Sequence, residues 1–141
     1  MKKFNVRVYG LLIYQNCLLV TQEKISGQII TKLPGGGLEF GEGTTDCLKR
    51  EFKEELNLEI EIHNHFYTTD FFVPSAFDDS QVISIYYTIN SLNINPTIHV
   101  ASNEKMVQSI KWIPIIDLES KLFHFPIDKH VINLFKSAYN H

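Results

Sequence analysis

Three glutamates gather on one face of a predicted helix in the first half of this chain of 141 residues. At about 100° per residue, Glu51, Glu54 and Glu55 fall within a single arc of about 100°. The neighbouring arc is apolar and consists of Leu48, Phe52 and Leu56. Such a helix packs along one face and collects negative charge along the next.

The repulsion between these carboxylates indicates a positively charged partner. Like charges three or four positions apart destabilise a helix by about 0.2–0.5 kcal/mol per pair, and Glu51 makes such a pair with both Glu54 and Glu55. Hard divalent cations are bound by carboxylate oxygens, and Mg²⁺ in particular by a few carboxylates together with water and substrate phosphates. The pattern favours a Mg²⁺ or Mn²⁺ site. A solvated acidic face, braced by an ion pair between Arg50 and Glu54, is the alternative.

Three consecutive glycines occupy residues 35–37, shortly before this helix. Glycine lets a backbone approach a ligand closely and adopt positive φ. This segment could therefore present a peptide carbonyl to a cation or amides to a phosphate. The helix is expected to begin near residues 43–45, with Gly43 or Thr44 as its N-cap, and to end at Asn57.

The spacing of the whole segment resembles the Nudix box of the Nudix hydrolase superfamily. In that pattern a glycine is followed after five residues by a glutamate, and after seven more by Arg-Glu, an apolar residue, any residue and Glu-Glu. The matching positions here are Gly36, Glu42, Arg50, Glu51, Phe52, Glu54 and Glu55. Asn57 replaces the last fixed glycine of the pattern, and asparagine is the usual second choice for a left-handed residue after a helix.

The resemblance implies a divalent cation, Mg²⁺ or Mn²⁺, as the cofactor. Glu51, Glu54 and Glu55 would be its ligands, and the carbonyl of Gly35 or Gly36 could complete the coordination shell.

The resemblance also implies catalytic and supporting roles. Arg50 would orient the acids through charge-assisted hydrogen bonds, and Glu42 would support that arrangement from the loop. Glu54 is the acid expected to matter most. The general base is left open between Glu51 and Glu104. Glu104 lies in a polar loop ahead of the last predicted strand, and an ordinary surface glutamate is the alternative there.

An unusually aromatic stretch extends over residues 66–77. Aromatic faces stack on nucleobases with about 1–3 kcal/mol each, so Phe72 and Phe77 are candidates for a stacking wall. Packing in the core is the alternative for this stretch. Gly36 and Gly37 are the other candidates for contact with a substrate.

Composition limits the class of partner. The 13 basic and 16 acidic residues give a net charge of −3, which lacks the positive surface of a protein that binds nucleic acid nonspecifically. Small-molecule nucleotides are therefore favoured over a nucleic-acid polymer. We find neither a signal peptide nor an apolar run near the ~18 residues of a membrane span.

Length and cysteine content indicate a compact protein of a reducing compartment. The length fits a single domain over residues 1–141. Cys17 and Cys47 are too few for a disulfide framework. We expect a cytoplasmic protein without a membrane partner, and a homodimer is left open.

Hydrophobic patterning predicts a mixture of strands and helices. Strands are predicted over residues 4–14, 17–23, 58–63, 81–90, 97–100 and 109–113. A second helix is predicted from Pro126, packing through Ile127, Val131, Leu134, Phe135 and Ala138. These elements indicate an α/β or α+β fold. The resemblance implies a Nudix-type α/β/α sandwich, with a mixed β-sheet between helices.

The resemblance implies a Mg²⁺-dependent Nudix pyrophosphohydrolase, that is, a hydrolase of phosphoric anhydride bonds. It would cleave the diphosphate linkage of a nucleoside diphosphate derivative. The position of Pro74 after the box is similar to that of a proline in the ADP-sugar pyrophosphatase branch, which favours ADP-ribose or another nucleotide sugar. A nucleoside triphosphate is the other substrate class. A noncatalytic nucleotide-binding sensor with a Nudix fold is the alternative function, and the intact set of acids argues against it.

Overall fold

The computed structural model describes residues 2–94 and 107–139. Its strands are β1 (Phe4–Tyr14), β2 (Cys17–Ile25), β3 (Gln28–Lys32), β4 (Gly35–Gly37), β5 (Ile60–Thr68), β6 (Gln81–Ser91) and β7 (Val107–Pro114). The two α-helices of the described part are α1 (Thr44–Leu56) and α2 (Pro126–Tyr139), and two short 3-10 helices cover Ile115–Asp117 and Ser120–Leu122. Glu104 and the strand predicted over residues 97–100 lie outside the described residues.

The sheet is mixed and is organised around β1. Along one edge of β1, residues 4–12 pair in parallel with β6, and β5 pairs antiparallel with β6 beyond it. The other edge of β1 is shared, because residues 7–9 pair with β4 and residues 13–14 pair with β2. β2 in turn pairs with β3 and β7. The sheet therefore forks at β1, with β4 on one branch and β2 on the other.

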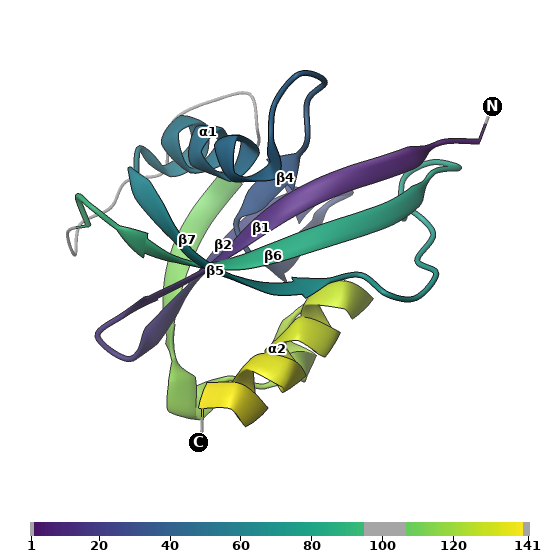
Figure 1. The fold of residues 1–141 in the computed structure, drawn as a ribbon. Helices are drawn as coiled ribbons and strands as arrows, with labels where there is room; N and C mark the ends of the chain where they lie inside the picture. The colour runs from purple at the N-terminus through teal and green to yellow at the C-terminus, as the bar shows by residue number, and fades with distance from the viewer. Residues whose placement is uncertain (1, 95–106, 140–141) are drawn as a thin grey trace.

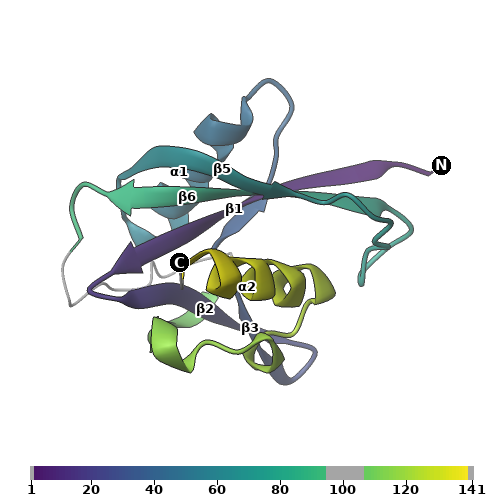
Figure 2. The ribbon, with the colours of Figure 1, turned by 60° about the horizontal axis from the view of Figure 1, so that its bottom comes forward.

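The two long helices cover opposite faces of this sheet. Figure 1 shows α1 on one side and α2 on the other, and Figure 2 views the molecule from the side of α2. Alternate positions of β1 supply the two cores, since successive strand residues point to opposite faces. Val8 and Leu12 pack with α1, whereas Leu11 packs with α2. The predicted α/β/α sandwich with a mixed sheet is confirmed.

The sequence places both ends of α1 correctly. Gly43 is the N-cap, and Asn57 follows the helix in the left-handed conformation at φ 53°. The backbone N–H of Asn57 donates to the carbonyl of Lys53, and that of Leu58 donates to the carbonyl of Phe52. These bonds satisfy carbonyls at the helix end, so asparagine does here what the pattern's glycine would do.

Three expectations about other elements need correction. β5 continues to Thr68, five residues beyond the predicted end, and β3 is a strand where none was predicted. On α2, Leu134 is 39% exposed and Ala138 is also exposed, so neither packs as expected. Ile132 is fully buried in their place. Which residues of α2 are buried depends on the core that the helix packs against, and sequence spacing alone does not fix this.

The glycine triplet also differs from the expected loop, because it forms the strand β4. A Cβ atom on Gly35 would lie 2.1 Å from the backbone oxygen of Val8, and the φ of Gly35 is +150°. Only glycine permits both the close approach of β4 to β1 and this φ. The pairing fixes the triplet in position beside α1.

Asp128 joins α2 to the sheet and to the segment that leads into β4. It is 3% exposed; the Tyr86 hydroxyl donates to its Oδ1 at 2.7 Å and the backbone N–H of Leu33 donates to its Oδ2 at 3.4 Å. Burial raises the pKa of Asp128 from 3.8 to about 6, although its hydrogen bond from Tyr86 opposes that shift.

This raised pKa predicts a specific pH dependence of stability. Between about pH 4 and pH 6 the folded protein holds a proton on Asp128 that the unfolded chain has released, so the free energy of unfolding falls as the pH rises. We expect Asp128→Asn to show a smaller fall than the wild type over this range in urea denaturation. Asp117→Asn, at an exposed position, is the control and should keep the wild-type slope. Equal slopes for Asp128→Asn and the wild type would contradict the assignment.

Candidate functional site

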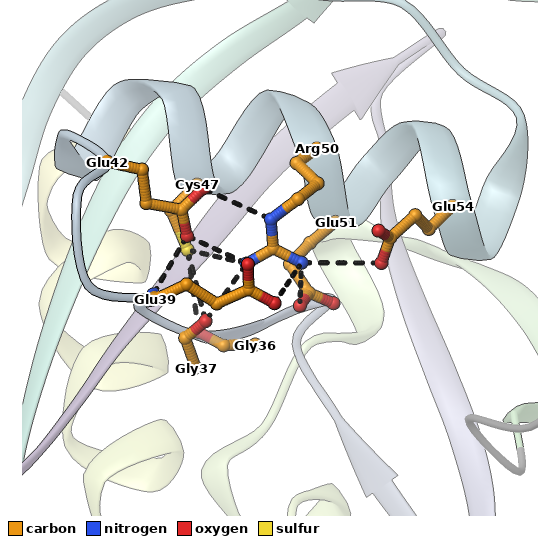
Figure 3. A network of polar contacts seen from close by, with 8 residues as sticks. All are labelled: Gly36, Gly37, Glu39, Glu42, Cys47, Arg50, Glu51 and Glu54. Carbon is orange, nitrogen blue, oxygen red and sulfur yellow. Dashed lines mark hydrogen bonds and ion pairs between the residues drawn. The ribbon is translucent and has the colours of Figure 1, made fainter.

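Arg50 lies at the centre of the predicted site. Its guanidinium binds Glu42 through two parallel hydrogen bonds, Nε to Oε2 at 3.1 Å and Nη2 to Oε1 at 2.8 Å (Figure 3). This contact lowers the pKa of Glu42 to about 2 and raises that of Arg50. Bidentate pairs of this kind are strong and directional. The loop before α1 is therefore held to the helix by Arg50 and Glu42.

The same guanidinium reaches other acids and the glycine strand. Nη1 donates to Glu51 Oε1 at 2.9 Å and to Glu54 Oε2 at 3.3 Å, and Nη2 donates to the carbonyl of Gly37 at 3.1 Å. Nη1 also forms an ion pair with Glu39 Oε1 at 3.6 Å. Figure 3 shows these groups converging on Arg50 from the helix, the loop and β4. Arg50 thus sets the positions of the carboxylates relative to the glycines.

The Glu51 carboxylate packs directly against Gly36. The Glu51 side chain is 2% exposed, and a Cβ atom on Gly36 would lie 2.4 Å from its Cδ. No side chain larger than hydrogen fits there without displacing the carboxylate. The residue pattern predicted that glycines would bring backbone close to a ligand; the structure adds that Gly36 makes room for an acid.

Glu55 is the second buried acid of α1, at 5% exposed. Burial raises its pKa, Lys32 opposes the shift, and Glu51 adds to it through its charge and as a hydrogen-bond partner. The structure therefore brings Glu51 and Glu55 together in the interior. Glu54 differs, because its side chain is 44% exposed and forms an ion pair with Arg50.

The predicted site residues do not all converge. Among residues 2–94 and 107–139, no three side chains of histidine, cysteine, aspartate or glutamate form a group that could hold a metal ion as placed. Gly35, whose carbonyl is a predicted ligand, is buried in β4. The ligand roles of Glu51, Glu54 and Glu55 stay predictions. In the same part of the chain, no helix is both long and apolar enough to cross a lipid bilayer.

A pocket of about 500 Å³ lies on the α2 side of the sheet. Its lining comes from β1, β2, β3, β6, residues 71–77 and residues 125–128. Phe72 and Phe77 are part of this lining and are each 68% exposed, so they lie at its rim and not in the core. They are placed where a ligand could stack on them, and their role as substrate contacts stays a prediction.

Sequence reasoning missed the polar residues of this pocket. Its lining includes Arg7, Tyr9, Lys32, Tyr86 and Asp128. They come from four segments far apart in the chain, so no local motif links them. Arg7 could have been noticed in the sequence, because it is a charged residue within a predicted strand, residues 4–14, that is otherwise largely apolar.

The contact between Gly36 and Glu51 predicts a difference between two neighbouring glycines. Gly36→Ala forces the Glu51 carboxylate to move and should lower the free energy of unfolding by about 1–3 kcal/mol, as overpacking does. Gly37→Ala is the matched control. Its Cβ atom would meet only Arg7 Nη1 at 3.6 Å, an ordinary contact, so its stability should stay close to the wild type. Urea denaturation without added metal measures both, and equal losses would contradict this account of Gly36.

Comparison with known proteins agrees with the fold. The family model described as NUDIX domain matches residues 3–135. The structure is similar to that of the E. coli ORF135 protein, with a TM-score of 0.78, 16% identity, and coverage of 98% of this chain and 92% of that chain.

Two further solved structures share the fold. A MutT NUDIX hydrolase from Burkholderia pseudomallei has a TM-score of 0.74 and 16% identity, with coverage of 94% of this chain and 98% of that chain. An ADP-ribose pyrophosphatase from Streptococcus suis has a TM-score of 0.69 and 15% identity, with coverage of 97% and 92%. At these identities the likeness shows the fold alone, whereas the family model extends over almost the whole sequence. The chain therefore belongs to the Nudix hydrolase superfamily.

Proposed function

We propose that this protein is a Mg²⁺-dependent pyrophosphohydrolase that cleaves the diphosphate linkage of a nucleoside diphosphate derivative. The observation that carries the proposal is the pair of buried carboxylates on α1, Glu51 and Glu55, packed beside the glycine strand. Composition further supports a cytoplasmic protein with one Nudix domain over residues 1–141.

The donor chemistry of this pair fits a hard divalent cation. Two adjacent carboxylates repel each other in a low-dielectric interior, and a cation near both relieves that repulsion. Carboxylate oxygens are also the ligands that Mg²⁺ and Mn²⁺ prefer. Glu51 and Glu55 would hold the ion, with Glu54 and the carbonyl of Gly35 as the other predicted ligands. When bound, a divalent cation supplies charge neutralisation for the anhydride oxygens and helps to generate the attacking water.

The remaining residues of the site position this chemistry. Arg50 fixes Glu51 and Glu54 by direct hydrogen bonds, and Glu42 holds Arg50 in turn. A proton must leave the attacking water, and the proposed acceptor is either Glu51 or Glu104. The buried environment of Glu51 excludes bulk water from that side of the reaction.

Two substrate classes are compatible with the pocket. A nucleotide sugar such as ADP-ribose is supported by Pro74, which lines the pocket together with Phe72 and Phe77, and by the shared fold with an ADP-ribose pyrophosphatase. A nucleoside triphosphate is the alternative. Their products differ, because ADP-ribose yields AMP and ribose 5-phosphate, whereas a triphosphate yields a monophosphate and pyrophosphate. A noncatalytic sensor would bind a nucleotide and release no product.

One prediction from this proposal concerns turnover. With Mg²⁺ and a panel of ADP-ribose, other nucleotide sugars and nucleoside triphosphates, the wild type should release products from at least one class. Glu51→Gln and Glu54→Gln should each lower kcat/KM by about a hundredfold or more, because several kcal/mol of charge stabilisation are lost. Glu61→Gln, an exposed acid on β5, is the matched control. Turnover unchanged in Glu54→Gln would count against its assignment, and a wild type inactive on the whole panel would favour the sensor.

Another prediction from this proposal concerns binding of the metal. A ligand that binds only the folded state stabilises it by about 2.7 kcal/mol at a hundredfold excess over Kd. Mg²⁺ should therefore raise the Tm of the wild type, and should raise that of Glu55→Gln much less. Without metal, Glu55→Gln should be at least as stable as the wild type, because it removes one of two adjacent buried carboxyls.

Glu61→Gln is again the control for the loss of one acidic charge and should keep the full Mg²⁺ response. A wild-type Tm that does not change with Mg²⁺ or Mn²⁺ would contradict the proposed metal site, whatever the activity measurements show.

A further inference from the structure

Two cationic side chains line the pocket, Arg7 from β1 and Lys32 from β3. Their electrostatic surroundings differ. Lys32 is 6% exposed, and its Nζ forms a salt bridge with Glu23 Oε1 at 3.2 Å. Burial opposes its charged form, but Tyr9, Glu23 and Glu55 favour it, and its pKa is raised. The charge of Lys32 is therefore already compensated within the protein.

Among the described residues, the carboxylates that favour the charge of Arg7 act on it through space. Its Nε donates to the Tyr9 hydroxyl at 2.5 Å, and its guanidinium carbon lies 5.7 Å from the centre of the Tyr9 ring. Within residues 2–94 and 107–139 it forms no salt bridge. A guanidinium carries five N–H donors in a planar fork. Among the described residues, no hydrogen bond joins its two Nη groups to a carboxylate, and this fork is suited to an anionic ligand.

Arg7 also lies close to β4, the strand that packs beside the acids of α1. Its Nη1 is 3.6 Å from the position that a Cβ atom on Gly37 would take. Gly36, the next residue of β4, packs against the Glu51 carboxylate. Burial opposes the charged form of Arg7, but Tyr9 and the carboxylates of Glu51 and Glu23 favour it, and its pKa is raised. The guanidinium is thus close enough to the acids to interact with them through space.

We propose that Arg7 binds the diphosphate of the substrate and orients it toward the acids of α1, with the nucleoside end in the pocket beside Phe72 and Phe77. The planar fork of arginine matches phosphate oxygens in pairs. The ligand class is a nucleoside diphosphate or a derivative of one. This inference rests on the proposed function, because it assigns a binding residue to the same site.

A purely structural role for Arg7 predicts something different. In that case Arg7 would act by holding Tyr9, and removal of the Tyr9 hydroxyl would do the same damage as removal of the guanidinium. If Arg7 binds phosphate, its loss weakens a ligand that contains a diphosphate, whereas Tyr9→Phe leaves the guanidinium charge in place. The two variants therefore separate ligand binding from support of the neighbouring ring.

The test is calorimetric binding of ADP in EDTA, with folding checked by circular dichroism. Arg7→Gln should raise the Kd of ADP by about tenfold or more, the usual effect of a lost charge-assisted hydrogen bond. Arg7→Lys keeps the charge but loses the fork, and should weaken binding by a smaller factor that is still measurable. Tyr9→Phe should stay within about threefold of the wild type, and so should Lys111→Gln, which removes an exposed positive charge on β7.

Any of three results would overturn the inference: wild type that does not bind ADP, Arg7→Gln that binds as tightly as wild type, or Tyr9→Phe that binds as weakly as Arg7→Gln. Should Arg7→Gln fail to fold, Arg7→Lys with unchanged affinity overturns it as well. This measurement needs neither metal nor turnover. Its failure is therefore distinguishable from failure of the proposed hydrolysis, which the product assay with Mg²⁺ tests by itself.

Discussion

The burial of two like-charged carboxylates on one helix is the constraint around which this structure is built. Glu51 and Glu55 point into the interior from α1. Like charges four positions apart destabilise an isolated helix. Several neighbours make the arrangement possible. Gly36 leaves room for one carboxylate, Arg50, the preceding residue on the helix, pairs with the same acid, and the charge of Lys32 opposes the rise in the pKa of Glu55.

The fork in the sheet brings the glycine strand β4 beside both α1 and β1, the strand that carries Arg7. α1 and α2 cover opposite sides of the sheet (Figure 1), and a continuous sheet would separate the acids from the pocket. The edge of β1 is shared, with β4 on one branch and β2 on the other. The charges of Arg7 on β1 and Lys32 on β3 interact through space with acids of α1. Asp128 supports the same region, because it binds the backbone of Leu33 just before β4.

Local patterns in the sequence were enough to predict most of the framework. The apolar stripe of α1 and the left-handed residue Asn57 are properties of a single segment, and both were read correctly. The pairing of the glycine triplet with β1 depends on contact between distant segments, so it could not be read from glycine content alone. The buried stripe of α2 was misplaced at Leu134 for a similar reason. Helical spacing identifies the apolar face of a helix, but the surface that packs against the helix decides which residues of that face are buried.

The candidate site was predictable to a lesser degree. The acids and Arg50 share a motif with fixed spacing, so the sequence places them on one helix, and the resemblance suggests their roles. The motif does not show that Glu51 and Glu55 are buried while Glu54 is exposed, because their burial depends on the position of β4. The pocket is harder still to predict. Its polar residues come from separate strands and from the first turn of α2, and only the folded chain places Arg7 beside the glycine strand.

The pocket walls also have a consequence for how such a protein diversifies. Residues 71–77, which supply Phe72 and Phe77, connect β5 to β6 and lie outside both strands. Connecting segments tolerate insertions and replacements better than the elements they join. Under the proposed function, recognition and reactivity are therefore encoded in separable parts of the chain. Under that proposal, changes in residues 71–77 can alter which nucleotide is accepted, while the acid helix, held by Gly36 and Arg50, is inherited intact.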